Sequence, residues 1–253
     1  MIDFTAATTI WVRNLLLYKR TWKMNIFPNF FEPVFYLLSM GIGLGAYVAG
    51  VGEESYLAYI APGLLASQAM MGASFETTYN TFVKMNFHRV YDAVLSTPAE
   101  VEDIVFGEML WATTRAVAYG AGFLLVTALF GLVSTPLALL TLPAIVLVGI
   151  LFGAIGLAFT ARIPYIDLYS YYYTLFVTPM FLFSAVFYPL DRYPEWVRPL
   201  AALDPLYHSV VLMRGLFRGE IVPELAVHAA WCLVVSAIFY RLAVSGMKKK
   251  LIG

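Results

Sequence analysis

The stretch that decides the fold is LALLTLPAIVLVGILFGAIGLAFTA, residues 137–161, which contains no charged side chain. A helix rises about 1.5 Å per residue, so about 20 apolar residues are enough to cross the hydrocarbon core of a bilayer. The stretch therefore predicts a membrane-spanning helix over Leu137–Ala161.

Other stretches on both sides of it meet the same requirement, and prolines and glycines separate most of them. Together they predict an all-α integral membrane protein with six spans, organised as a single transmembrane domain over residues 1–253. Besides Leu137–Ala161, the expected spans are Phe30–Gly50, Tyr56–Thr81, Ile104–Leu132, Ile166–Tyr188 and Pro223–Val244.

The composition of the whole chain agrees with a lipid environment. Of its 253 residues, 61% are hydrophobic and 13% are charged, whereas a soluble domain is about half apolar and about a quarter charged. The net charge is zero, so the chain lacks the basic surplus of a nucleic-acid-binding protein. Cys232 is the single cysteine, which excludes an internal disulfide and a cysteine-rich metal site.

Lysine and arginine near span ends indicate the orientation of a membrane protein. With six spans, the basic residues of the N-terminal segment, of the loop after the second span and of the C-terminal end fall on one side. We therefore expect both termini in the cytoplasm, with Glu53 and Glu54 outside. Segment 189–221 is the exception, because its arginines fall on the outer side, where we expect short interfacial helices: Arg192, Arg198, Arg214 and Arg218.

An amphipathic helix is expected over residues 1–27. At about 100° per residue, its large apolar side chains fall on one arc and its basic side chains on another. Such a helix lies in the membrane interface, where it either steers lipid-linked substrates or serves only as an anchor. The apolar arc contains Phe4, Trp11, Leu15, Tyr18 and Trp22, and the basic arc contains Arg13, Lys19, Arg20 and Lys23.

The loop between the second and third spans, residues 82–103, contains a short amphipathic helix at His88–Leu95 that ends at Ser96–Pro98. Acidic Glu102 and Asp103 follow at the expected start of the next helix, where the helix dipole favours negative charge. A cytoplasmic helix in this place can transmit motion from a soluble partner, although many membrane proteins have such loops.

Two ionisable residues lie inside expected spans at comparable depth, Glu76 in the second span and Arg115 in the third. A charge in hydrocarbon is costly and usually faces another charge. Because consecutive spans are antiparallel neighbours, we expect a Glu76–Arg115 ion pair or a shared polar network. A proton relay through Glu76 is the alternative.

Two further patterns each allow two interpretations. Small residues four apart, at Gly41–Gly45–Ala49 and Gly149–Gly153, let helices approach closely, either within the chain or at a dimer seam. Tyrosines at the start of the fifth span are typical of an aromatic belt, or of a span that lines a glycan path, because aromatic faces stack on sugar rings: Tyr165, Tyr169, Tyr171, Tyr172 and Tyr173.

The sequence lacks the common motifs for nucleotide binding, metal binding and hydrolysis. It contains no Gly-x-x-x-x-Gly-Lys-Ser/Thr phosphate loop, no His-Glu-x-x-His and no Gly-x-Ser-x-Gly. The three histidines, His88, His208 and His228, are not spaced as metal ligands. We therefore expect no catalytic residue and no metal site, and any uphill transport must draw its energy from a gradient or a partner.

Residues 181–216 resemble the signature of exporter-type ABC permeases of the second class, although Tyr188 is inserted in the usual Phe-Pro. The matching residues are Phe187–Pro189, Pro194–Trp196, Pro205–Tyr207 and Arg214. Within that family, three further stretches resemble the permeases that export nodulation factors, which are lipo-chitooligosaccharides: Ser74–Tyr79, His88–Pro98 and Val105–Ala112.

The resemblance implies a non-enzymatic permease in a bacterial inner membrane that exports a lipid-linked oligosaccharide, a polysaccharide or a similar amphiphile. It implies no cofactor bound by this chain, but a permease homodimer with two separate ATP-binding subunits that use ATP and Mg²⁺. Segment 189–221 would form re-entrant helices that close the path from outside.

The same resemblance assigns residues to two sites. The dimer seam and translocation path would include Tyr36, Gly41, Gly45, Tyr169, Tyr172 and Phe176. The helix coupled to the ATPase would comprise His88, Arg89, Val90, Tyr91, Asp92, Ala93, Val94, Leu95, Ser96, Thr97 and Pro98.

Other functions stay open at this point. A drug or antibiotic efflux permease of the same class would share all of these features. A proton-coupled secondary transporter would depend on Glu76. A membrane-embedded enzyme or scaffold would need a cluster of polar catalytic groups at one membrane face, and the sequence shows none.

Overall fold

The computed structural model describes residues 2–43, 45, 47, 48, 50, 51 and 54–253, without the side chains of residues 25–30, 32, 33 and 42. Ala49 and Glu53 therefore lie outside the described residues. Within the described part of the chain the regular structure is helical, apart from one isolated bridge between Val51 and Glu54. The expectation of an all-α chain is confirmed.

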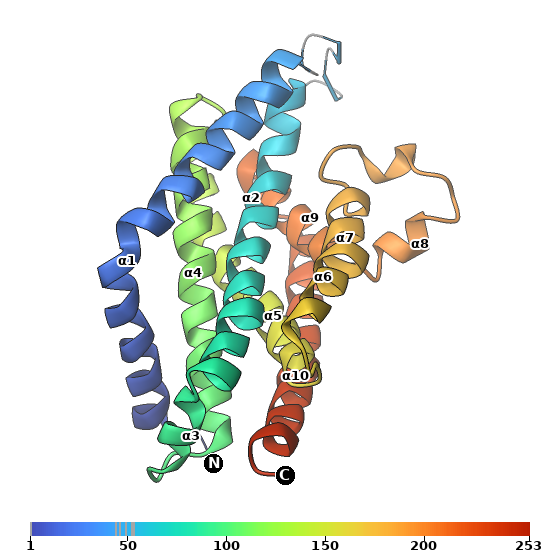
Figure 1. The fold of residues 1–253 in the computed structure, drawn as a ribbon. Coiled ribbons are helices and arrows are strands. Elements are labelled where there is room, and N and C mark those ends of the chain that lie inside the picture. The colour runs from blue at the N-terminus through green and yellow to red at the C-terminus, as the bar shows by residue number, and fades with distance from the viewer. Residues whose placement is uncertain (1, 44, 46, 49, 52–53) are drawn as a thin grey trace.

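Long helices run along the length of the molecule, and the two ends of the chain lie at the same end of the bundle (Figure 1). The short helix α3 (Val90–Leu95) lies at this end too. The long helices are α1 (Phe4–Leu38), α2 (Tyr56–Phe75), α4 (Val101–Leu129), α5 (Thr141–Thr160) and α10 (Pro223–Leu251).

Shorter elements extend or join them. The π-helical segments η1 (Ser39–Gly43), η3 (Glu76–Asn80) and η4 (Val83–Phe87) continue α1 and α2, and the 3₁₀ turn η5 (Pro136–Leu140) precedes α5. The fifth expected span consists of η6 (Ile166–Leu168), α6 (Tyr169–Tyr171), η7 (Tyr172–Val177) and α7 (Thr178–Phe183), and the opposite end has η8 (Leu190–Arg192), α8 (Arg198–Ala201) and α9 (Pro205–Arg218).

Three helical stretches of the described chain are long and apolar enough to cross a membrane by length and composition alone. They are Val101–Leu129, Pro136–Thr160 and Pro223–Leu251, and they coincide with the third, fourth and sixth expected spans. Of the three, Pro136–Thr160 has the highest mean hydropathy.

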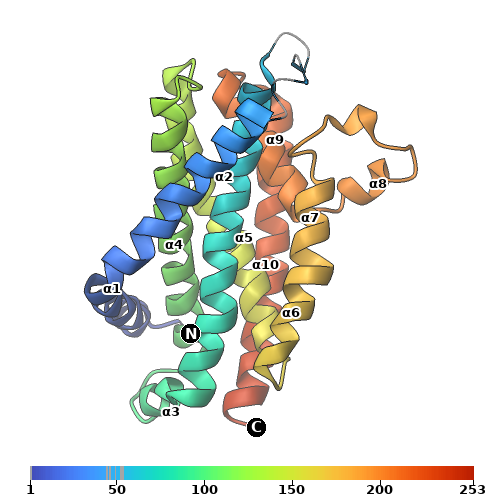
Figure 2. The ribbon, with the colours of Figure 1, turned by 45° about the horizontal axis from the view of Figure 1, so that its top comes forward.

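Helix α1 differs from the sequence-based expectation, because it runs without a break through the boundary expected near residue 27. Asp3 caps its start by accepting hydrogen bonds from the amides of Thr5 (2.8 Å) and Ala6 (3.4 Å). The helix then follows α4 toward the other end of the bundle and bends on its way (Figure 2). The interfacial segment and the first expected span therefore form one element.

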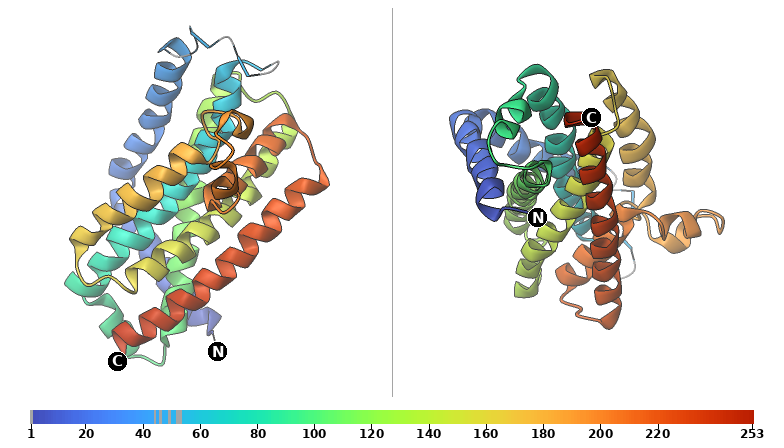
Figure 3. Two further views of the ribbon diagram at one scale, coloured as in Figure 1. Left: turned by 90° about the vertical axis from the view of Figure 1, so that its right-hand side faces the viewer. Right: turned by 90° about the horizontal axis from the view of Figure 1, so that it is seen from below.

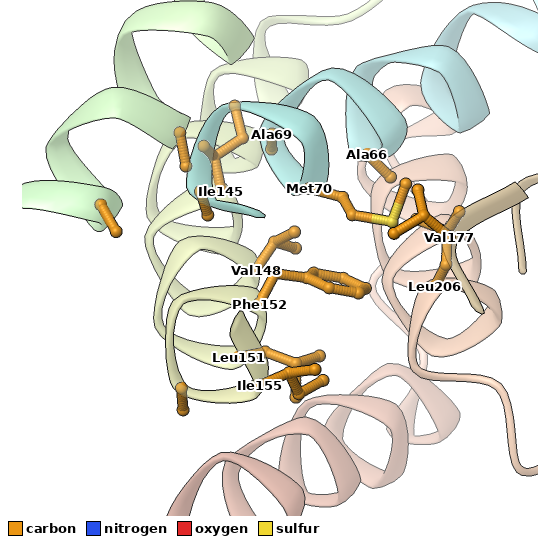
Figure 4. Close-up of a cluster of buried hydrophobic side chains, with 14 of the residues drawn as sticks. Ala66, Ala69, Met70, Ile145, Val148, Leu151, Phe152, Ile155, Val177 and Leu206 are labelled. Atoms are coloured by element: carbon orange, nitrogen blue, oxygen red, sulfur yellow. The ribbon is translucent and has the colours of Figure 1, made fainter. Parts of the chain in front are cut away.

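Helix α5 lies at the centre of the apolar core. Its residues Val148, Leu151 and Phe152 lie between α2, which contributes Ala66 and Met70, and the neighbouring α9 and η7 (Figure 4). Of the apolar stretch of α5, 61% is buried inside the chain, against 17% for α10. Helix α10 therefore forms an edge of the bundle (Figure 3, left).

Small residues allow the close packing of α5. A Cβ added to Gly149 would lie 2.9 Å from the Cβ of Ala116 in α4, and one added to Gly156 would overlap the hydroxyl oxygen of Thr77 in η3. Gly153 also faces α4, with Ala112 nearby. Of the two interpretations of Gly149–Gly153, the structure supports packing within the chain.

Candidate coupling surface and buried ion network

The segment expected to couple to a partner is helical over a shorter range than the sequence predicts. His88 ends η4, and Arg89 has left-handed backbone angles, φ 47° and ψ 38°. Helix α3 therefore begins at Val90, not at His88, because Arg89 turns the chain between η4 and α3. The ring of Tyr91, which is 1% exposed, anchors α3 to the bundle.

The outer side of this segment is open to solvent. Arg89 and Asp92 form an exposed ion pair with 3.9 Å between Nη1 and Oδ2. Val90, Val94 and Leu95 are half-buried, and the other members are exposed: His88, Arg89, Asp92, Ala93, Ser96, Thr97 and Pro98. The segment thus has an anchored inner side and an outer side that a soluble protein can contact.

A cavity of about 710 Å³ lies between this segment and the start of α1. Thr9, Ile10 and Arg13 line it from α1, and Arg89 and Pro98 line it from the other side. The two elements lie next to each other at one end of the molecule (Figure 3, right). The exposed segment therefore forms one wall of a hollow rather than an isolated projection.

Lys84, in η4, lies just before this segment and bridges two buried carboxylates. Its Nζ atom lies 3.0 Å from Oε1 of Glu76 in η3 and 2.7 Å from Oε2 of Glu108 in α4. The exposed fractions of the three side chains are 13%, 7% and 1% in that order. Buried charges are stable only when they are paired and hydrogen-bonded, so Lys84 is needed by both carboxylates.

Further contacts extend this ion network to α1. Asn14 donates a 3.1 Å hydrogen bond to Oε2 of Glu108, and Asn80 donates a 3.0 Å hydrogen bond to Oε2 of Glu76. Arg115 Nε lies 3.7 Å from the same Glu76 oxygen. Together with Lys84, these contacts connect α1, η3, η4 and α4. We define this set of residues as the ion network.

The predicted Glu76–Arg115 pair thus lies within ion-pair distance, but Lys84 makes the shorter contact. The guanidinium of Arg115 also stacks on the ring of Tyr18, 4.4 Å from its centroid. Sequence reasoning treated Lys84 only as a basic loop residue that marks orientation. A charge three residues beyond the expected span end at Thr81 gives no signal that its side chain reaches back into the bundle.

The start of α4 is acidic, as expected, and it is joined to both ends of the chain. Asp103 accepts hydrogen bonds from the amides of Asp3 (2.7 Å) and Glu100 (2.8 Å), and the second closes a capping box. Glu102 forms an ion pair with Lys248 near the end of α10.

The aromatic arc of the N-terminal segment packs in part against α4. Trp11 donates a 2.9 Å hydrogen bond from Nε1 to the hydroxyl of Thr114, and Tyr18 contacts Trp111 edge to face with centroids 5.7 Å apart. Trp22 is exposed, and so are the basic residues Lys19, Arg20 and Lys23. The sequence assigned the whole arc to lipid, because periodicity shows which side chains share a face but not what covers it.

Most of the tyrosines in the fifth expected span are packed inside the chain. The hydroxyl of Tyr169 is hydrogen-bonded to that of Thr160 (2.7 Å), and the hydroxyl of Tyr173 to that of Thr78 (3.0 Å). Tyr172 is buried and is hydrogen-bonded to Ser74 (3.4 Å). In contrast, Tyr165 and Tyr171 are exposed. These contacts join α6 to α5, and η7 to α2 and η3.

The remaining residues expected at the seam or path lie on α1, η1 and η7 and in the segment after η1. Tyr36, in α1, is half-buried with its ring 6.5 Å from that of Phe181, and Phe176, in η7, is half-buried against Tyr172. Gly41 lies near Leu57, and among the described residues a Cβ added to Gly45 would lie 3.6 Å from the carbonyl oxygen of Met40.

The other end of the molecule contains contacts that the sequence did not predict. Arg218 forms a two-fold salt bridge with Glu54 (2.8 and 3.0 Å), which joins α9 to the start of α2.

The Nδ1 atoms of His208 and His228 lie 2.8 Å apart, and Trp231 stacks on His208. These histidines come from different helices, so sequence spacing could not reveal the pair. No third potential metal ligand joins them among the described residues.

Long apolar helices, three of them long and apolar enough to cross a membrane, pack around a buried ion network and indicate an integral membrane protein. Residues 5–217 match the family described as ABC-2 type transporter. The chain therefore belongs to the ABC-2 type transporter family, and it is a permease of that family.

Named relatives cover almost the whole chain. It is 34% identical to nodulation protein J of Rhizobium leguminosarum bv. viciae over 96% of this chain and 93% of the relative. Identity to nodulation protein J of R. leguminosarum bv. trifolii is 35% with the same coverage. The inner membrane transport permease YadH of Escherichia coli is 25% identical over 85% of this chain and 84% of the relative.

Proposed function

We propose that this chain is the membrane-spanning subunit of an ATP-driven exporter that moves a lipid-linked oligosaccharide or a similar amphiphile out of the cytoplasm. The observation that carries this proposal is the mostly exposed segment His88–Pro98, which follows Lys84 in η4 and is joined through this lysine and the ion network to α1, η3 and α4. A displacement of this segment is therefore passed directly to α1, η3 and α4.

The cargo class rests on the relatives called nodulation protein J and on the resemblance to permeases that export lipo-chitooligosaccharides. Exposed aromatic residues near η7, Tyr165 and Tyr171, are available to contact sugar rings. The alternative cargo is a drug, which an efflux permease of the same family would carry. Proton-coupled transport is less well supported, because Glu76 is held by Lys84 and Asn80.

In this proposal the chain spans a bacterial inner membrane six times, with both termini in the cytoplasm. Besides the three long apolar helices, α1, α2 and the succession from α6 to α7 are the remaining spans. Helices α8 and α9 close the path from the outside as the re-entrant segment. The location of both chain ends at one end of the bundle supports an even number of spans.

The proposed assembly contains two copies of this chain and two ATP-binding subunits, which hydrolyse ATP with Mg²⁺. Binding of ATP draws the ATP-binding subunits together and moves His88–Pro98 on each permease. The free energy for the outward-open state comes from the difference in ATP affinity between the two states of the partner. This chain contributes the path and the coupling surface.

Co-reconstitution with an ATP-binding subunit in vesicles tests this function. We expect vanadate-sensitive movement of a fluorescent lipo-oligosaccharide that requires both proteins and ATP. Movement of hydrophobic drugs but not of the glycolipid would identify the efflux alternative. Uphill transport by the permease alone, driven by a proton gradient, would overturn the proposal.

A further inference from the structure

Two cavities meet at Arg162, where α5 ends beside the last turns of α10. The first is an apolar groove of about 480 Å³ between α5, η7 and α10, lined among others by Phe159, Leu175, Phe239 and Leu242. The second, of about 430 Å³, lies at the end of the bundle that contains the C-terminus. Arg162 lines both cavities.

The second cavity is basic. Its lining contains Arg162, Lys249 and Lys250 and no acidic residue. Arg162 donates hydrogen bonds to the carbonyl groups of Ala158 and Leu242, so its guanidinium spans the gap between α5 and α10.

The lysines differ in how they are held. Lys250 donates to the carbonyl groups of Thr160 (3.0 Å) and Ile163 (2.6 Å), which fixes its ammonium at the end of α5. Lys249 is exposed. Three cations thus surround one hollow, and two of them are held in place by backbone carbonyl groups.

We propose that these two cavities form one binding site for an anionic phospholipid. The phosphate lies among Arg162, Lys249 and Lys250, and an acyl chain lies in the groove along Leu175 and Phe239. Basic pockets between membrane helices at the headgroup level favour anionic lipids. A free phosphate ion would leave the apolar groove without an occupant, so charge and lining together indicate an amphiphile with a negative headgroup.

The position of the groove gives such a lipid a structural role. Helix α10 is the least buried of the three long apolar stretches, and the groove separates it from η7. A lipid in the groove contacts α5, η7 and α10 together, and it fills space that the side chains leave open. The site requires only that the chain spans a membrane, and it does not depend on the cargo or the ATP-binding subunit.

Photolabelling of the full chain in phosphatidylcholine vesicles tests this site. The probe is phosphatidylglycerol with a diazirine in its acyl chain, and a phosphatidylcholine probe with the same chain is the comparison. We expect the anionic probe to label the peptides that contain Leu175 and Phe239, and the neutral probe to label them several-fold less.

Variants supply the decisive comparison. Lys249→Gln and Arg162→Gln are each expected to reduce labelling by the anionic probe about fivefold. Arg241→Gln is the matched control, because Arg241 is an exposed cation of α10 that lines neither cavity. Since Arg162 bonds to the backbone, Lys249→Gln also tests the site if Arg162→Gln fails to fold.

Three results would each overturn the proposal. The first is equal labelling by the two probes, and the second is an equal loss of labelling in Arg241→Gln and Lys249→Gln. The third is absence of label from both peptides, as expected if a second copy of the chain covers the groove.

Discussion

At the residue scale, Lys84 determines how the buried charges are satisfied. Its ammonium group lies between Glu76 and Glu108, closer to Glu76 than Arg115 is. Removing it leaves two buried carboxylates with one cation and neutral donors. Because an uncompensated buried charge is strongly destabilising, this lysine matters for the stability of the bundle as well as for the coupling segment.

A double-mutant cycle measures which cation holds Glu76. We expect an interaction energy of about 1–3 kcal/mol between Glu76→Gln and Lys84→Met. The cycle of Glu76→Gln with Arg115→Met should give a smaller energy, because that contact is longer, 3.7 Å against 3.0 Å. Thermal unfolding of the purified variants in detergent gives both values. A larger energy for the arginine cycle would contradict the assigned role of Lys84.

The contact between Gly156 and Thr77 predicts a second effect on stability. Gly156→Ala should destabilise the protein by about 1–3 kcal/mol, because the new methyl group overlaps the threonine hydroxyl. Gly122→Ala is the control, since no atom of the described residues lies within 4 Å of a Cβ built at this position in α4 and alanine is about 1 kcal/mol better than glycine inside a helix. We expect Gly156→Ala to lower the melting temperature and Gly122→Ala to raise it. Equal shifts in the two variants would show that the contact of Gly156 with Thr77 is not the cause.

At the scale of single elements, η4 and α3 are separated by one left-handed residue. A non-glycine residue with these angles costs about 1–2 kcal/mol relative to the right-handed helix, so the surrounding contacts must hold Arg89 in place. Tyr91 and Lys84, on either side of it, provide such anchors. The coupling segment is therefore attached firmly at its base while its outer side stays exposed.

This attachment predicts the result of substitutions on the outer side. Arg89→Gly retains the backbone turn, and Asp92→Ala removes the other half of the exposed ion pair. Each should reduce transport per ATP hydrolysed about tenfold, which corresponds to about 1.4 kcal/mol of lost contact with the partner, and membrane insertion should be unchanged.

Transport and ATPase activity of the reconstituted complex provide the measurement for these variants. Arg241→Ala serves as the control, because Arg241 is an exposed arginine in α10, outside both the proposed coupling segment and segment 189–221. Normal transport by both coupling variants would show that the partner binds elsewhere.

At the scale of the whole molecule, the helices differ in how much of their surface the chain itself covers. Helix α5 is enclosed, whereas α10 exposes Leu233, Val234 and Ile238. The end of α1 exposes Phe35, and α7 exposes Phe183. In the proposed dimer, α1 and α7 face the second copy, and α10 faces lipid.

Cysteine crosslinking in membranes tests this arrangement. The buried Cys232 is first replaced by serine, and single cysteines then replace Phe35, Phe183 or Leu233. We expect a short bismaleimide to link Phe35→Cys or Phe183→Cys variants into dimers, because these positions lie at the proposed seam. Leu233→Cys, similarly exposed on α10, should not be crosslinked. Efficient crosslinking of Leu233→Cys alone would place the seam on α10.

The sequence by itself determined the features that depend on local pattern. Apolar length predicted the helices α4, α5 and α10, and the acidic start of α4 followed from the preference of a helix N-terminus for negative charge. The stretch Ser96–Pro98 likewise marked the end of α3. Each of these features depends on neighbours within a few turns of the chain.

Only the tertiary structure decided which distant side chains meet. It made Lys84 the closest cation to Glu76, brought His208 to His228, and covered Trp11 and Tyr18 with α4. Periodicity places a residue on a face and at a depth, but several helices offer partners at the same depth. The choice among them depends on how whole helices pack, and this is a property of the complete bundle.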